Sequence, residues 1–199
     1  MEENNKEMKE LLKELDEIPE NDSLSRTIEQ MKTEPEVAKD SPEYTDNLIR
    51  LYRFFNDKIY TPKRVFYPCC GLDASPLRGF PDSEIILMDQ DERCEKAMKK
   101  YNLPFIKGDV KEYNSDKSID LIIIRDPAVK SENLVKNLIK GGYVISNNYH
   151  LNAKELSEMV DKFKVVGTIK ENLNEKINLK KDISDMFKNR EDCYVFQKK

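Results

Sequence analysis

Three aspartates in this chain each follow a predicted strand. Asp89 comes directly after the apolar run 84–88, Asp109 follows the short run 104–106, and Asp126 follows the run 119–124. The carboxyl ends of parallel strands lie along one edge of a sheet, so we expect these carboxylates to share one crevice. A carboxylate there accepts hydrogen bonds from sugar hydroxyls or takes a proton from a reacting group.

Asp89 has the spacing of a nucleoside-binding acid. It lies 18 residues after Gly71, and an acid at about that distance accepts hydrogen bonds from the ribose of a bound nucleoside. Its alternative role is to cap the helix predicted from residue 91, although Asp91 suits that position better. The spacing therefore favours ribose binding by Asp89.

The turn after the first strand indicates which nucleoside the crevice accepts. Residues 69–74 read Cys-Cys-Gly-Leu-Asp-Ala, with one glycine and one carboxylate. Dinucleotides require several glycines so that their pyrophosphate can approach the backbone, and the carboxylate of Asp73 would repel that phosphate. We therefore expect a positively charged nucleoside without phosphate.

Two further groups are candidates for contacts with a substrate. Asp126 could orient an amine or act as a general base, or it could cap the loop beside Arg125. The next predicted strand is followed by four residues with amide, phenol and imidazole groups: Asn147, Asn148, Tyr149 and His150. Such groups contact substrates in pockets, but they are also ordinary turn formers, so both interpretations stay open.

The sequence contains four cysteines and one histidine. No two cysteines have the C-x-x-C spacing of a zinc site, so we expect no metal. A nucleophilic pair of His150 with a cysteine is an alternative, but a single histidine is more often structural. Cys69 and Cys70 either line the crevice as redox-sensitive thiols or pack as small hydrophobic groups, and we favour packing.

Strands and helices alternate from residue 63 onward, and these elements must position the crevice. Strands are predicted at 64–67, 84–88, 104–106, 119–124, 143–146, 163–169 and 192–197, helices at 91–101, 131–139 and 153–162, and helical or irregular structure at 172–189. This alternation predicts an α/β fold, a Rossmann-like doubly wound and mostly parallel sheet of about six or seven strands with helices on both faces.

Helical patterns precede this region. Apolar residues recur at helical spacing over 8–18 and 24–31, and Ser41-Pro42 predicts the start of a helix that ends before Thr61. We therefore expect an acidic helical arm with a lead-in helix at 1–60, followed by a Rossmann-like domain at 61–199. Residues 1–40 carry 13 acidic and 6 basic side chains, which is more typical of a solvated arm than of a dedicated partner-binding segment.

The composition excludes several classes of partner. The 199 residues are 36% charged with a net charge of −4, which gives no support to binding nucleic acid through its phosphates. No apolar run approaches the roughly 20 residues of a membrane span. The charged N-terminus lacks a signal-peptide pattern, so we expect a cytoplasmic protein without a membrane partner.

Several segments, in order along the chain, resemble the motifs of class I S-adenosylmethionine-dependent methyltransferases. The glycine-rich first motif is degenerate here, and the second and third motifs each contain one of the strand-end acids. The resemblance covers about residues 63–199 and rests on the runs 65–71 (VFYPCCG), 86–91 (ILMDQD), 106–110 (IKGDV), 119–124 (IDLIII), 138–145 (LIKGGYVI) and 193–198 (CYVFQK).

This resemblance implies S-adenosylmethionine as the cofactor and assigns roles to the matching residues. The second motif would bind the ribose, the third motif the adenine and the first motif the methionine part. The implied cofactor-binding residues are Tyr67, Pro68, Cys69, Gly71, Asp89, Gln90, Asp109 and Val110.

The first motif departs from the superfamily pattern. The superfamily usually has an acid where Tyr67 stands and glycines where Cys69 and Asp73 stand. The resemblance implies a methyltransferase with an unknown acceptor, for which a small molecule or a protein is favoured over nucleic acid. The altered loop keeps a second hypothesis open, a non-catalytic protein of this fold that binds another ligand or a partner. An aminopropyltransferase is disfavoured because its site needs more acids.

Overall fold

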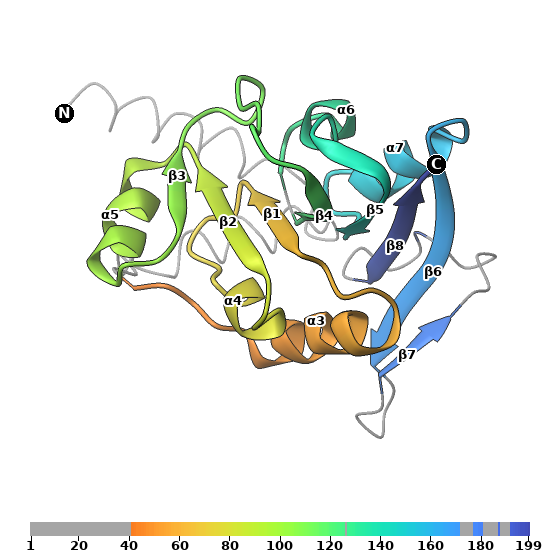
Figure 1. Cartoon of the computed structure of the whole chain (residues 1–199), viewed down its shortest axis with the longest axis horizontal. Coiled ribbons are helices and arrows are strands. Elements are labelled where there is room, and N and C mark those ends of the chain that lie inside the picture. The colour runs from red at the N-terminus through yellow and green to blue at the C-terminus, as the bar shows by residue number, and fades with distance from the viewer. Residues whose placement is uncertain (1–40, 126, 172–176, 181–186, 188–191) are drawn as a thin grey trace, which may run out of the picture. The chain divides into compact units, whose positions relative to one another are not determined.

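A computed structural model describes residues 41–125, 127–171, 177–180, 187 and 192–199. The helices predicted at 8–18 and 24–31 lie outside these residues. The described helices are α3 (Asp46–Lys58), α4 (Pro76–Gly79), α5 (Glu92–Lys100), α6 (Ser131–Leu134) and α7 (Asn152–Glu158) (Figure 1). Within the described part of the chain, no helix has the length and apolar character needed to cross a membrane.

One sheet of eight strands organises these residues. The strands are β1 (Arg64–Pro68), β2 (Glu84–Asp89), β3 (Phe105–Lys107), β4 (Ile119–Ile124), β5 (Leu138–Ser146), β6 (Phe163–Glu171), β7 (Ile177–Lys180) and β8 (Cys193–Lys198). They lie in the order β3-β2-β1-β4-β5-β8-β6-β7. β1 to β5 pair in parallel, whereas β6, β7 and β8 pair antiparallel with their neighbours. The predicted doubly wound, mostly parallel α/β fold is confirmed.

The order of the strands also locates a ligand crevice. The chain builds outward from β1 to β3 and then returns to place β4 on the other side of β1. At such a reversal the connections after β1 and β4 leave in opposite directions, which opens a crevice at the carboxyl ends of these strands.

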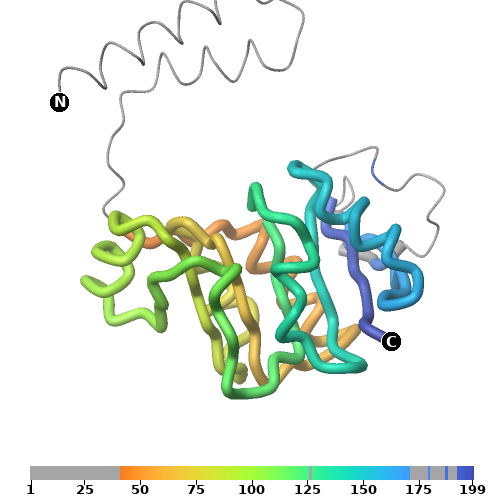
Figure 2. The backbone as a smooth tube through the Cα atoms, turned by 90° about the horizontal axis from the view of Figure 1, so that it is seen from above, coloured from red at the N-terminus to blue at the C-terminus, as the bar shows by residue number. Residues whose placement is uncertain are grey.

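Helices cover both faces of the sheet (Figures 1 and 2). Successive side chains of a strand point to opposite faces, so Val65 and Tyr67 pack in the core that α3 covers, whereas Phe66 packs in the core beneath α6 and α7. All six residues of β4 are buried, as predicted for a strand covered on both sides.

Two predictions about β5 and β7 were wrong. The helix predicted at 131–139 ends at Leu134, and β5 already begins at Leu138 because that residue pairs with Ile119 across a register shift in β4. Gly141 has φ +80° and lies within β5, where it allows this irregular pairing. Residues 177–180, expected to be helical or irregular, form β7 because they pair with β6 at the end of the sheet.

The start of α3 also differs from the prediction. Ser41-Pro42 does not begin the helix, because residues 42–45, here called the lead-in segment, run extended beside the loop after β1. Glu43 forms a parallel β-bridge with Asp73. Its N–H donates to the Leu72 carbonyl at 2.8 Å, and its carbonyl accepts from the Ala74 N–H at 2.8 Å. The helix can therefore begin only at Asp46.

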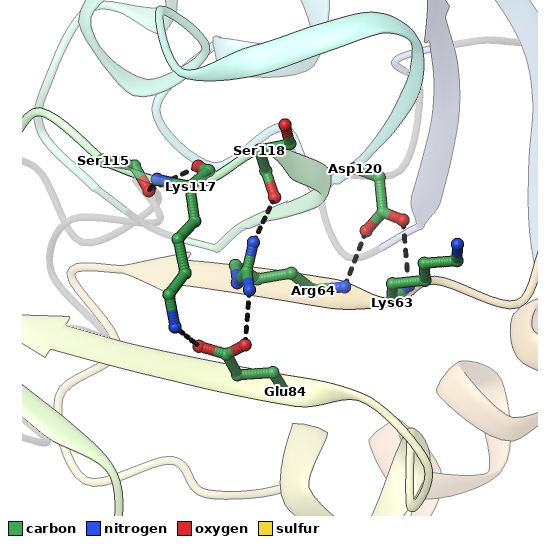
Figure 3. A network of polar contacts seen from close by, with 7 residues as sticks. All are labelled: Lys63, Arg64, Glu84, Ser115, Lys117, Ser118 and Asp120. Carbon is green, nitrogen blue, oxygen red and sulfur yellow. Dashed lines mark hydrogen bonds and ion pairs between the residues drawn. The ribbon is translucent and has the colours of Figure 1, made fainter.

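A buried carboxylate holds the strands together at their amino-terminal ends, opposite the crevice. Asp120 of β4 accepts hydrogen bonds from the backbone N–H groups of Lys63 at 2.9 Å and Arg64 at 2.8 Å (Figure 3). It also accepts a hydrogen bond from the Tyr60 hydroxyl at 3.2 Å. The Arg64 guanidinium pairs with Glu84 at the start of β2. This network holds the amino-terminal ends of β1, β2 and β4 together, away from the crevice.

Candidate functional site

A cavity of about 340 Å³, here called the strand-tip cavity, lies at the carboxyl ends of β1, β2 and β3. Its lining residues are Cys69, Gly71, Met88, Asp89, Gln90, Gly108, Asp109, Val110, Pro127, Ala128 and Val129. Six of the eight residues predicted to bind the cofactor are among them: Cys69, Gly71, Asp89, Gln90, Asp109 and Val110. The topology therefore brings together side chains that are up to 41 positions apart in the sequence.

Two backbone donors hold the carboxylate of Asp89. Oδ2 accepts from the Gly71 N–H at 2.9 Å, and Oδ1 accepts from the Asp91 N–H at 3.0 Å. The side chain of Asp91 caps α5 by accepting from the Arg93 N–H at 2.8 Å, so the preference for Asp91 as the cap is confirmed. Because a carboxylate has about four acceptor positions, Asp89 keeps capacity for two sugar hydroxyls.

Asp109 and apolar side chains form the remainder of this cavity. Oδ1 of Asp109 accepts from the Lys111 N–H at 2.8 Å, and the residue is exposed at the rim. Met88 and Val110 are buried beside it. A Cβ at Gly108 would lie 3.0 Å from Cε of Met88, so a side chain at that position would crowd the cavity wall. Apolar walls with a carboxylate at one edge suit a flat, polar-edged base.

A second cavity, of about 460 Å³, lies between the loop after β1 and the lead-in segment, and we call it the lead-in cavity. It is lined by Glu43, Thr45, Leu48, Tyr67, Cys69, Cys70, Gly71, Leu72, Asp73, Cys94 and Arg125. It shares Cys69 and Gly71 with the strand-tip cavity. Tyr67, predicted to bind the cofactor, lines this cavity, whereas the buried Pro68 lines neither.

The loop between the two cavities has an unusual backbone. Cys69 has φ +53° and Gly71 has φ +55°, so both lie in the left-handed region. Glycine adopts this region without strain, but a residue with a Cβ pays on the order of 1 kcal/mol. Cys69 therefore occupies a conformation suited to glycine, at a position where the motif it resembles has glycine.

Asp73 and Tyr67 form a contact that the sequence did not predict. The Tyr67 hydroxyl donates to Oδ2 of Asp73 at 3.1 Å, and Oδ1 accepts from the Ser75 N–H at 2.8 Å. Burial raises the pKa of Tyr67 well above its usual value, so the hydroxyl stays protonated and acts as the donor. This pair stands where the resembled motif has an acid and a glycine.

All four cysteines are free thiols. Cys70 is buried in the core beneath α3, where burial raises the pKa of its thiol. Cys69 is partly buried, and burial together with the carboxylates of Asp89 and Asp109 raises its pKa to about 11. Cys69 is therefore a neutral thiol at physiological pH. The favoured packing role agrees with the position of Cys70, while Cys69 faces both cavities.

The residues predicted to contact a substrate lie elsewhere. Asn147 and Asn148 are buried, and Oδ1 of Asn148 accepts from the Lys154 N–H of α7 at 3.0 Å. Tyr149 and His150 are exposed, and none of the four lines either cavity. Their role in substrate binding stays a prediction.

Asp126, the predicted catalytic residue, lies outside the described residues. Its neighbours are placed, and they line different cavities: Arg125 lines the lead-in cavity and Pro127 the strand-tip cavity. Within the described ranges, no three His, Cys, Asp or Glu side chains form a group that could hold a metal ion.

Sequence reasoning did not assign Glu43, Thr45 or Leu48 to the site. No local pattern marks these residues, because they reach the loop after β1 only through the long-range bridge of the lead-in segment. The apolar wall formed by Met88 and Val129 was also missed, although both residues lie close to the carboxyl end of a strand.

Comparison with known proteins finds solved methyltransferases whose fold is similar to that of this chain. No family model matches the chain, and no curated protein matches its sequence. The N-methyltransferase NodS from Bradyrhizobium japonicum WM9, solved with S-adenosyl-L-homocysteine, is similar in structure: 12% identity, 87% of this chain and 96% of that chain covered, and TM-score 0.54.

Two further solved methyltransferases are also similar. For the glycopeptide N-methyltransferase MtfA, complexed with S-adenosyl-L-methionine, the identity is 11%, 79% of this chain and 96% of that chain are covered, and the TM-score is 0.52. For the plantazolicin methyltransferase BpumL, in complex with S-adenosylhomocysteine and a substrate analogue, the identity is 16%, 77% of this chain and 83% of that chain are covered, and the TM-score is 0.50. At these identities the likeness shows the fold.

Proposed function

We propose that this chain, which has the fold of class I S-adenosylmethionine-dependent methyltransferases, binds S-adenosylmethionine and transfers its methyl group to a small molecule or a protein. The observation that carries the proposal is the strand-tip cavity, in which Asp89 and Asp109 lie at the ends of neighbouring strands beside Gly71.

The residues of this cavity fit a nucleoside. Asp89 is fixed by backbone donors and would accept hydrogen bonds from the ribose hydroxyls, while Asp109 would face the polar edge of the adenine. Met88 and Val110 would contact the faces of the base. No lysine or arginine is among the lining residues, which suits a nucleoside without phosphate.

The methionine part would extend past Cys69 and Gly71 toward Tyr67 in the lead-in cavity, because those two residues line both cavities. S-adenosylmethionine supplies an activated methyl group. The protein therefore has mainly to align the acceptor with that group and to exclude competing reactions, which a small set of positioned side chains can accomplish.

The charges of the two cavities support an acceptor other than nucleic acid. Their lining residues include the acids Glu43, Asp73, Asp89 and Asp109, against one base, Arg125. A surface that binds nucleic acid neutralises phosphates with clusters of lysine and arginine. The acids here would repel a phosphate backbone instead.

A non-catalytic role is the second candidate, and Cys69 favours it. Its side chain stands at the junction of the two cavities, where the resembled motif has glycine, and its backbone is left-handed. A side chain at this junction narrows the passage from one cavity to the other. In this alternative the crevice would bind a nucleoside or another small ligand without methyl transfer.

A calorimetric titration with S-adenosylmethionine and S-adenosylhomocysteine tests the proposal. We expect micromolar binding, about −8 kcal/mol. Asp89→Asn should weaken it at least tenfold, because one acceptor oxygen is replaced by a donor. Asp82→Asn, at an exposed aspartate that lines neither cavity, is the matched control. Absence of binding at millimolar ligand would refute the proposal, whereas binding without turnover of any acceptor would favour the non-catalytic alternative.

A further inference from the structure

The lead-in segment fixes one carboxylate-bearing residue against the loop after β1. The two backbone hydrogen bonds of Glu43 to Leu72 and Ala74, each 2.8 Å, place this residue beside the loop. The Thr45 N–H donates to Oγ of Ser75 at 2.9 Å, which adds a third link. Glu43 is partly buried and lines the lead-in cavity. A segment outside the strand–helix alternation therefore supplies a wall of the cavity and a negative charge.

The lead-in cavity is lined by acidic, basic and apolar side chains. Asp73 is held in place by Tyr67 and Ser75, and Arg125 supplies a positive charge. Leu48 and Leu72 add apolar surface. The cavity volume of about 460 Å³ lies within the range of about 300–1,000 Å³ for small-molecule sites.

A buried hydroxyl interacts with one of the residues that line this cavity. Tyr52 of α3 is 1% exposed, and burial raises the pKa of its hydroxyl well above the usual value. The charge of Arg125 and a side-chain hydrogen bond with it act in the opposite direction. Arg125, which lines the cavity, therefore also interacts with a buried hydroxyl of the core.

The proposed function assigns the part of the lead-in cavity beside Cys69 and Tyr67 to the methionine end of the cofactor. We propose that the part of the same cavity beside Glu43 receives the methyl acceptor as an amine in its cationic form, and that Glu43 is the residue that selects for positive charge. This inference rests on the proposed function. Methyl transfer to the amine forms one N–C bond and breaks one S–C bond, whose electron pair stays with the sulfur. The ammonium releases one proton to solvent before the nitrogen attacks.

Electrostatic focusing gives Glu43 its expected effect. Charges of one sign that line a cleft raise the local concentration of the opposite ion, by about tenfold or more. Acceptors that share a primary amine but differ in a remote charge should therefore differ in rate. We expect kcat/KM for the formation of S-adenosylhomocysteine to be highest with 1,3-diaminopropane, lower with propylamine and lowest with β-alanine.

The variant Glu43→Gln tests the residue itself. Measured at saturating S-adenosylmethionine, it should lower kcat/KM for 1,3-diaminopropane about tenfold and reduce the differences in kcat/KM among the three amines. Glu43→Asp should restore part of the preference. Glu112→Gln, at an exposed glutamate outside both cavities, is the matched control. A faster reaction of β-alanine, or an unchanged order in Glu43→Gln, would overturn the inference.

A second measurement needs no turnover. Cys69 lines the cavity, so its rate of modification by a cationic and an anionic methanethiosulfonate reports the local potential, with Cys69→Ser as the labelling control. We expect a cationic-to-anionic rate ratio about tenfold above that of the urea-unfolded chain, and a smaller ratio in Glu43→Gln. A ratio equal to the unfolded value would overturn the inference even if no amine reacts. Absence of S-adenosylmethionine binding by the unchanged protein would instead refute the proposed function.

Discussion

Replacing Asp120 by alanine should destabilise the fold and leave both cavities in place. Asp120 is 5% exposed and accepts hydrogen bonds from the N–H groups of Lys63 and Arg64 (Figure 3). It also accepts a hydrogen bond from the Tyr60 hydroxyl. These contacts lie at the amino-terminal ends of β1 and β4, whereas the cavities lie at the carboxyl ends. Asp120→Ala should therefore lower the stability of the sheet without changing the residues that line either cavity.

The magnitude follows from the donors that lose their acceptor. Each unsatisfied N–H group costs about 1–3 kcal/mol, while the partly exposed Tyr60 hydroxyl can turn to water. Two such groups give a loss of about 3 kcal/mol in the free energy of unfolding. A chain of this length loses about 2–4 °C in Tm for each kcal/mol, so Tm should fall by about 6–12 °C.

Thermal unfolding followed by circular dichroism measures this loss. Glu84→Gln is the control, because the Glu84 side chain is 47% exposed and its ion pair with Arg64 is screened by solvent. We expect little change in that variant. If Asp120→Ala unfolds at the same temperature as Glu84→Gln, the role assigned to the buried carboxylate is wrong.

Three further predictions concern Gly79 of α4 and Cys69 of the loop after β1. Gly79→Ala should cost about 1–3 kcal/mol in unfolding free energy by denaturant titration, because its Cβ would lie 2.4 Å from Cβ of Tyr52; an unchanged midpoint would show that α3 and α4 pack differently. Cys69→Gly should stabilise the fold by up to about 1 kcal/mol, since glycine relieves the left-handed strain at φ +53°; the same titration would contradict this by showing a clear loss. Alkylation of Cys69 by iodoacetamide, located by peptide mass, should keep accelerating with pH until about 11, because its pKa is raised to about 11 and only the thiolate reacts; a plateau near pH 8.5 would contradict that burial.

The features that could be predicted from the sequence are those encoded locally. The run 119–124, which is apolar except for Asp120, predicted a strand, and the six residues of β4 are buried. The sequence also indicated that Asp91 caps the helix and that Asp89 is the strand-end acid. This distinction could be predicted because a capping side chain bonds to a backbone group only two positions away. Strand-end acids meet in one cavity because the topology of a parallel sheet requires it.

The features that were missed depend on long-range pairing. Ser41-Pro42 has the composition of a helix start, but the backbone bonds of Glu43 to the loop after β1 keep the segment extended. Residues 138 and 139 were assigned to a predicted helix, and only the pairing of Leu138 with Ile119 of β4 places them in a strand. In each case the deciding partner is distant in sequence or a backbone group.

The most direct test of the central claim is a structure of this chain with S-adenosylhomocysteine bound. We predict that the ribose hydroxyls donate to the carboxylate of Asp89 in the strand-tip cavity, that the adenine lies beside Asp109, and that the homocysteine part passes Cys69 into the lead-in cavity. A ligand bound elsewhere, or an Asp89 carboxylate that makes no contact with the ribose, would contradict the account.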